Sequence, residues 1–263
     1  MSGAENMTLA PGETSAWIRR FHPAPEARTR LVCLPHAGGS APYFFPVSRA
    51  LAPDIDVLAV QYPGRQDRRA EKCIDNIAEL ADHVAGQLTA WADKPLTLFG
   101  HSMGATLAFE VARRLGPEMT VLGVIASGRC APSSTRFDNV HNLDDTRLLG
   151  ELRLLSGTDA QILGDEEIVR MVLPAIRADY TAAETYRCDP GVRIPYPILT
   201  MIGDDDPRAS LDEARAWAGH TEAEFGMRIF PGGHFYLNDH ADAVITTVAG
   251  QIGTWSAAVS PVR

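Results

Sequence analysis

Cysteine is scarce in this chain of 263 residues, and its spacing fits neither a disulfide framework nor a metal site. Cys33, Cys73, Cys130 and Cys188 lie far apart, and no Cys-x-x-Cys pair occurs. This spacing predicts reduced, mostly buried thiols. The zinc motif His-Glu-x-x-His is also missing, and the acidic triplet Asp204–Asp206 is better explained as a loop. We therefore expect no metal.

The loops that bind nucleotide phosphates are missing as well. The sequence contains neither Gly-x-Gly-x-x-Gly nor a Gly-Lys-Ser/Thr step, and Gly38-Gly39 alone does not make a phosphate loop. We therefore expect the protein to work without a cofactor.

Positive charge and long apolar runs are both in short supply. The chain has 24 Lys and Arg against 33 Asp and Glu, a formal net charge of −9. This balance disfavours binding to nucleic acid. No stretch is long and apolar enough for a membrane span, and the first two dozen residues lack the apolar core of a secretory signal. The sequence thus predicts a cytoplasmic protein with no membrane or nucleic-acid partner.

What the chain does have is an alternation of short apolar runs with helical patterns. Continuous apolar runs without alternation are typical of strands buried on both faces, and their alternation with helices predicts an α/β fold with a mainly parallel sheet and helices on both faces. A further short edge strand or arm is expected at Ala16–Arg20, and Met1–Thr14 is expected to be a loose leader. The predicted buried strands are Arg30–Leu34, Ile55–Gln61, Leu96–Phe99, Val121–Ser127, Tyr196–Ile202 and Gly226–Phe230.

The alternation stops between about Ser134 and Arg193. Two helical patterns replace the strands there, at Asp144–Leu155 and Asp165–Tyr186. We interpret residues 134–193 as a helical lid inserted into a core made of residues 15–133 and 194–257. The alternative is an ordinary crossover helix with a long loop.

The motif with the clearest chemistry is Gly-His-Ser-Met-Gly at 100–104. It follows a predicted strand and opens a predicted helix, which is the setting of a nucleophile elbow. Such an elbow exposes Ser102 at the carboxyl end of the sheet. It also predicts Met103 N–H as one donor to the oxyanion, because this amide directly follows the nucleophile at a helix N-terminus.

A serine nucleophile needs a base and a group that orients the base, in the chain order Ser, acid, His. His234 follows the last predicted strand on a Gly-Gly turn and is the preferred base, whereas His220 and His240 suit surface or capping positions. Among the aspartates after Tyr196–Ile202, Asp206 at the loop's bend is the preferred acid. Asp204 is the alternative.

The second oxyanion donor is expected in the loop after the strand Arg30–Leu34. That loop reads Pro-His-Ala-Gly-Gly, and Ala37 is our choice for the donating N–H. The alternative is a glycine-rich turn with no catalytic part.

Together these residues resemble the type II thioesterases that accompany polyketide and non-ribosomal peptide synthases. The resemblance runs from about Trp17 to Trp255. It implies an α/β-hydrolase core, a helical lid, a Ser102–Asp206–His234 triad and the release of stalled acyl groups from carrier proteins. The matching segments are Leu-Pro-His-Ala-Gly-Gly-Ser-Ala at 34–41, Gln-Tyr-Pro-Gly-Arg at 61–65, the elbow at 100–104, Gly-Asp-Asp-Asp-Pro at 203–207 and Pro-Gly-Gly-His-Phe at 231–235.

The resemblance also implies a partner, an acyl carrier protein with its phosphopantetheine arm, and we expect the enzyme itself to be a monomer. Arg65, Arg68 and Arg69 form a basic cluster, interpreted first as a solvated loop and second as a docking site for an acidic carrier protein. Rival functions are a small-molecule carboxylesterase, a chain-terminating thioesterase and a non-catalytic hydrolase-fold binding protein.

Overall fold

The structure is a computed structural model that describes residues 15–134, 136, 139–154 and 166–259. The predicted leader at residues 1–14 lies outside this part of the chain. Within it, one sheet contains seven strands. They are β1 (Ile18–Arg19), β2 (Thr29–Leu34), β3 (Ile55–Val60), β4 (Leu96–His101), β5 (Val121–Ser127), β6 (Ile198–Gly203) and β7 (Phe225–Phe230).

The strand order is β1-β3-β2-β4-β5-β6-β7. Strands β2 to β7 pair in parallel, and only the short β1 pairs antiparallel, with Ile18 opposite Val60 at the edge. The predicted mainly parallel sheet is therefore confirmed. Strand β6 begins two residues later than predicted, because Pro197 has no N–H to donate to a neighbouring strand.

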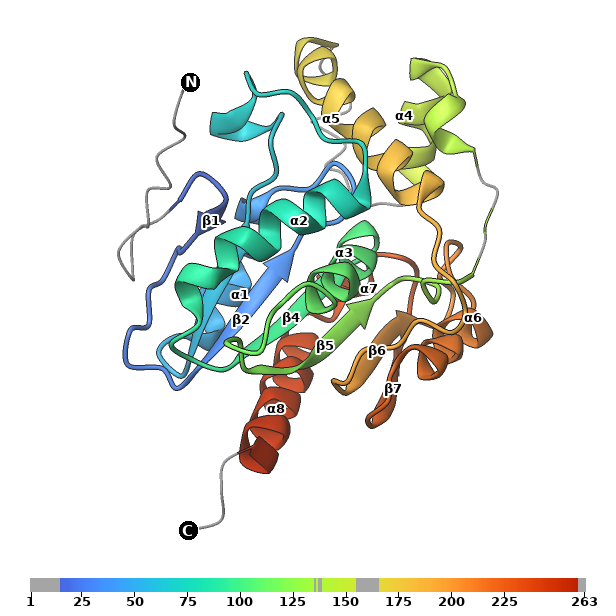
Figure 1. The fold of residues 1–263 in the computed structure, drawn as a ribbon. Helices are drawn as coiled ribbons and strands as arrows, with labels where there is room; N and C mark the ends of the chain where they lie inside the picture. The colour runs from blue at the N-terminus through green and yellow to red at the C-terminus, as the bar shows by residue number, and fades with distance from the viewer. Residues whose placement is uncertain (1–14, 135, 137–138, 155–165, 260–263) are drawn as a thin grey trace, which may run out of the picture.

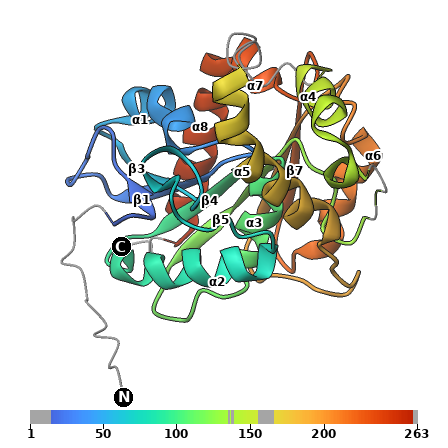
Figure 2. The ribbon, with the colours of Figure 1, turned by 90° about the horizontal axis from the view of Figure 1, so that it is seen from above.

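Helices cover both faces of the sheet (Figures 1 and 2). Figure 2 shows α1 and α8 on one side and α2 and α3 on the other. The described helices are α1 (Phe45–Leu51), α2 (Ile77–Leu88), α3 (Met103–Ala112), α4 (Asp145–Leu154), α5 (Glu166–Thr185), α6 (Leu211–Arg215), α7 (Tyr236–Asp239) and α8 (Ala241–Val259).

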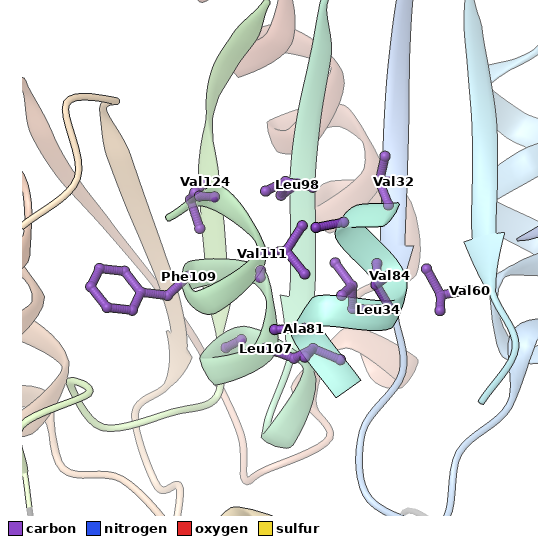
Figure 3. Close-up of a cluster of buried hydrophobic side chains, with 14 of the residues drawn as sticks. Val32, Leu34, Val60, Ala81, Val84, Leu98, Leu107, Phe109, Val111 and Val124 are labelled. Atoms are coloured by element: carbon purple, nitrogen blue, oxygen red, sulfur yellow. The ribbon is translucent and has the colours of Figure 1, made fainter. Parts of the chain in front are cut away.

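The core has two layers because successive strand residues point to opposite faces of the sheet. In β2, for example, Val32 and Leu34 pack in the layer under α2 and α3, whereas Leu31 and Cys33 pack in the layer under α1 and α8. Figure 3 shows the first layer, in which helix residues such as Leu107 meet the strand side chains. Because the side chains on both faces of the sheet are buried, the strand sequences are continuous apolar runs.

Two helices, α4 and α5, lie between β5 and β6 in the sequence, at the two predicted helical patterns. Figure 1 shows them above the end of the sheet to which the arrowheads of β2 and β5 point. Residues 155–165 between them lie outside the described part of the chain. Because the loops after parallel strands gather at this end, α4 and α5 are placed over any site built there.

The four cysteines are free thiols, with Cys33 and Cys130 buried as predicted and Cys73 and Cys188 half-buried. Burial raises the pKa of the Cys33 thiol, which keeps it protonated. Among the described helices, none combines the length and the apolar composition that a membrane span requires.

Candidate active site

Ser102 stands at a strained turn between β4 and α3. Its backbone has φ 55° and ψ −119°. Residues other than glycine rarely adopt this conformation, which costs about 1–3 kcal/mol. The turn is held by a hydrogen bond of 2.8 Å from Ser102 N–H to Ser127 O, at the end of the neighbouring β5. The hydroxyl is therefore held at the carboxyl end of the sheet, as the elbow motif predicts.

The two glycines of the elbow are required by close backbone contacts. A Cβ at Gly100 would lie 1.9 Å from Gly104 O, and a Cβ at Gly104 would lie 2.1 Å from Leu34 O. No real Cβ atom comes this close to a carbonyl oxygen. The first turn of α3 therefore lies directly against the end of β2, where the Pro-His-Ala-Gly-Gly loop begins.

His234 and Asp206 are joined in the loops that follow β7 and β6. His234 Nδ1 lies 3.0 Å from both Oδ1 and Oδ2 of Asp206, and the two side chains are almost completely buried. Asp206 Oδ1 also accepts a 2.8 Å hydrogen bond from Arg208 N–H. The carboxylate is thus fixed on both sides and orients the imidazole through its Nδ1.

The other candidates for acid and base lie elsewhere. Asp204 is exposed, and its carboxylate accepts a 2.8 Å hydrogen bond from Gly232 N–H, which ties the β6 loop to the β7 loop. His240 is half-buried and precedes α8. The expectation that His220 is a surface or capping residue is wrong, because its side chain is buried and its ring nitrogens bond Val192 O and Ser133 Oγ at 2.8 Å each.

All the predicted site residues except the buried Asp206 line one pocket. Ser102, Met103, Ala37 and His234 line it, and α5 also contributes lining residues, Tyr180 among them. No hydrogen bond joins Ser102 Oγ to His234 within the described part of the chain. Such bonds are commonly long before substrate binds, so the two groups remain a candidate nucleophile and base.

Two backbone amides are available at this pocket for a developing oxyanion. Met103 is the first residue of α3, so its N–H has no acceptor within the helix and lies at the positive end of the helix dipole. Ala37 also lines the pocket, in the loop after β2. This loop turns tightly, with Gly39 N–H donating to His36 O at 2.9 Å.

Sequence reasoning missed a buried ion pair beside this loop. Arg65 binds Asp179 of α5 through two hydrogen bonds, from Nη1 to Oδ2 at 2.6 Å and from Nη2 to Oδ1 at 2.8 Å. Both side chains are buried, and removing one partner of such a pair costs about 3–5 kcal/mol. A signal was present, because Asp179 interrupts the buried stripe of Ala175, Ile176 and Ala182 on α5.

The basic cluster therefore has a different role from either of those expected. Arg65 is buried against Asp179, and Arg68 is buried against Glu71 with its guanidinium 4.2 Å from the Trp17 ring centroid. Only Arg69 is exposed. Interpretation of the cluster as a solvated loop or a docking site is thus wrong for Arg65 and Arg68.

Two more imidazoles surround His234 in the interior. His101 of the elbow has its ring centroid 5.0 Å from that of His234 and bonds Ser127 Oγ, which in turn bonds Tyr236 OH. Burial, together with the neighbouring His234, lowers the pKa of His101 well below its usual value. The same causes, with Arg65, lower the pKa of His36 to about 3. Both rings are therefore neutral at physiological pH.

No cluster of three metal-ligating side chains occurs within the described residues.

Comparison with known proteins assigns the chain to a family. The Thioesterase domain model matches residues 29–252. The chain belongs to the thioesterase family, and its core is an α/β-hydrolase fold.

Named relatives are similar over nearly the whole chain. Thioesterase PikA5 of Streptomyces venezuelae is 49% identical over 243 residues, which cover 91% of this chain and 86% of that protein. Among solved structures, the type II thioesterase BorB from the borrelidin biosynthetic cluster is 53% identical with a TM-score of 0.85, covering 91% of this chain and 99% of BorB. RedJ, a thioesterase from the prodiginine pathway of Streptomyces coelicolor, is 33% identical with a TM-score of 0.80, covering 95% and 96%.

Proposed function

We propose that this enzyme hydrolyses the thioester between an acyl group and the phosphopantetheine arm of an acyl or peptidyl carrier protein, and so clears stalled units from a biosynthetic synthase. The observation that carries the proposal is a strained serine sharing one pocket with a histidine fixed by a buried aspartate. The relatives support this class of substrate, because BorB is a type II thioesterase from a biosynthetic cluster.

In the proposed reaction, Ser102 Oγ attacks the thioester carbonyl while His234 Nε2 takes its proton. Asp206 holds the imidazole in the tautomer that leaves Nε2 free to accept. The Met103 and Ala37 amides stabilise the negative charge that develops on the carbonyl oxygen. When the carbon–sulfur bond breaks, the proton on His234 passes to the leaving pantetheine thiolate.

The acyl-Ser102 ester is then hydrolysed by the same groups. His234 takes a proton from a water molecule as the water oxygen attacks the ester carbonyl, and returns it to Ser102 Oγ as the ester bond breaks. The products are a free carboxylic acid and the unchanged enzyme.

Residues 134–193 form the lid in this proposal, with α4 and α5 as its described helices, and α5 lines the pocket. Hydrogen exchange is expected to show faster opening in α4 and α5 than in the central strands. Strong, uniform protection across both helices would contradict a mobile lid. The enzyme is further proposed to act as a cytoplasmic monomer, and gel filtration across a hundredfold range of concentration tests the monomer.

One experiment tests the proposed function directly. Wild type and Ser102→Ala are compared on a panel of acyl-carrier proteins, free acyl thioesters and matching oxygen esters. We expect wild type to prefer carrier-bound thioesters, and Ser102→Ala to lose about 10⁴-fold or more in kcat. Preference for the oxygen esters would favour a carboxylesterase, and full activity of Ser102→Ala would refute the mechanism.

A further inference from the structure

The loop after β2 is held from above by α5, through groups that the proposed reaction does not itself use. Gly38 N–H donates a 2.7 Å hydrogen bond to Asp179 Oδ2. The Gly38 backbone has a φ of +75°, and a Cβ built on it would lie 2.9 Å from Ile176 Cγ1. Helix α5 therefore contacts this loop twice, once through a hydrogen bond and once through packing that leaves no room for a side chain.

Arg65 completes the attachment. It binds both oxygens of Asp179, and its Nη1 also donates to Gly39 O at 3.1 Å. The ion pair thus bonds the N–H of Gly38 through its carboxylate and the C=O of Gly39 through its guanidinium. Burial opposes the charge of Arg65, but the Asp179 carboxylate outweighs it and raises the pKa of Arg65, so the guanidinium stays charged.

These bonds act on the residue expected to stabilise the oxyanion. The C=O of Ala37 and the N–H of Gly38 belong to one planar peptide unit, so fixing Gly38 N–H fixes the orientation of that plane. The direction of Ala37 N–H depends on the same stretch of backbone. An oxyanion donor works only within about 2.7–3.1 Å of the oxygen, so a small rotation of this loop is enough to weaken it.

We propose that Asp179 and Arg65 are positioning residues, which hold Ala37 N–H in its oxyanion-binding geometry only while α5 rests on the loop. The inference rests on the proposed function, because it needs an oxyanion in the reaction. It adds a link between the position of α5 and the strength of oxyanion stabilisation. When α5 moves away, Gly38 loses its acceptor and Arg65 loses its counter-charge together.

The first variant is Asp179→Asn, which keeps the size of the side chain. Its single amide oxygen cannot accept from Gly38 and from both guanidinium nitrogens at once. We expect kcat for a short soluble acyl thioester to fall on the order of 10²-fold with KM changed less than about threefold. Affinity for a boronic acid that carries the same hydrocarbon chain should fall in parallel, because its tetrahedral adduct with Ser102 places an oxygen at the oxyanion position.

The chain offers a matched control in Asp56→Asn. Asp56 is fully buried, binds Arg20 through both oxygens at 3.0 Å and accepts from Ala24 N–H at 3.2 Å. It lies at the start of β3, whereas the site lies at the carboxyl ends of the strands. Asp56→Asn is expected to lower the unfolding temperature while it leaves kcat and boronic acid affinity at wild-type values.

A second variant keeps the test decisive should Asp179→Asn fail to fold. The double substitution Arg65→Met with Asp179→Leu removes both charges and leaves apolar groups of similar size, which such sites commonly tolerate. It still deprives Gly38 and Gly39 of their partners, so it should show the same parallel loss.

The inference is overturned if the folded Asp179 variants keep wild-type kcat and boronic acid affinity, or if Asp56→Asn loses both equally. Failure of the proposed function looks different. Wild type would then hydrolyse no thioester, or Ser102→Ala would remain active.

Discussion

The two halves of the proposed catalytic site are built in different ways. Ser102, Asp206 and His234 follow the parallel strands β4, β6 and β7 of one sheet. Backbone hydrogen bonds hold these strand ends, from Ser102 N–H to Ser127 O of β5 and from Asp205 N–H to Gly232 O. The loop that carries Ala37 is held instead by Asp179, which comes from a helix 141 residues further along the chain. The first half is a property of the sheet, and the second depends on how α5 packs on the loop.

The largest effect is expected from a change that breaks the sheet-built half alone. Asp206→Asn should lower kcat about 10⁴-fold, about 5.5 kcal/mol, because His234 loses the carboxylate that selects its tautomer. Steady-state kinetics on an acyl thioester measure this. Asp204→Asn is the control, since its remaining oxygen still accepts from Gly232. If Asp204→Asn carried the loss instead, Asp204 would be the acid.

The next effect tests the contact where the two halves meet. Gly104→Ala places a Cβ 2.1 Å from Leu34 O and 2.7 Å from Pro35 O, so α3 and the end of β2 must separate. We expect the free energy of unfolding to fall by more than about 4 kcal/mol, measured by chemical denaturation. Gly250→Ala on α8, with nothing within 4 Å, should instead stabilise by up to about 1 kcal/mol. Equal effects would contradict the contact.

The third effect concerns His36 in the loop after β2 and is measured as the pH dependence of the free energy of unfolding. Burial lowers the pKa of His36 from 6.5 to about 3 in the folded protein, so between these values the unfolded chain binds the extra proton. Stability must therefore fall as the pH drops below 6.5. His36 alone should contribute a loss of about 2 kcal/mol at pH 5 relative to pH 8. Denaturation of His36→Phe at both values should show a difference smaller by that amount, and an unchanged difference would refute it.

The smallest loss of stability is expected from a change at Tyr236, whose hydroxyl is linked through Ser127 to His101 of the elbow. Tyr236 OH lies 2.6 Å from Ser127 Oγ, which also bonds His101 at 2.9 Å. Tyr236→Phe removes one bond of this chain and leaves Ser127 a partner, so we expect a loss of about 1 kcal/mol and a fall of about 2–4 °C in Tm. Calorimetry measures the fall. A kcat changed more than about threefold would show that His101 supports the elbow's chemistry.

The sequence predicts the sheet and the sheet-built half of the site for one physical reason. Strand patterns, the elbow and the loop after β7 are local signals, and parallel strands bring their ends together whatever lies between them. The expected pairing of Asp206 with His234 follows from that rule, and the structure shows the two hydrogen-bonded.

The remaining features depend on contacts that no local pattern encodes. Arg65 and Asp179 are 114 positions apart, and no local sequence pattern around either residue indicates that the two form a pair. The helical pattern at Asp165–Tyr186 predicts α5, but it does not show which of its apolar residues are covered, since 56% of Met171 is exposed. A charged residue within an otherwise buried helical stripe indicates that a distant residue of opposite charge packs against it.

The close approach of Gly104 to Leu34 also bears on engineering the acyl selectivity of this enzyme. The elbow and the start of the loop after β2 are packed too closely to admit a larger side chain, since even a methyl group at Gly104 would overlap a backbone oxygen. Room for a longer or branched acyl chain has to come from side chains, and Tyr180 and Ala183 of α5 are among those that line the pocket. Substitutions of these two residues are expected to reshape the pocket while the elbow backbone stays in place.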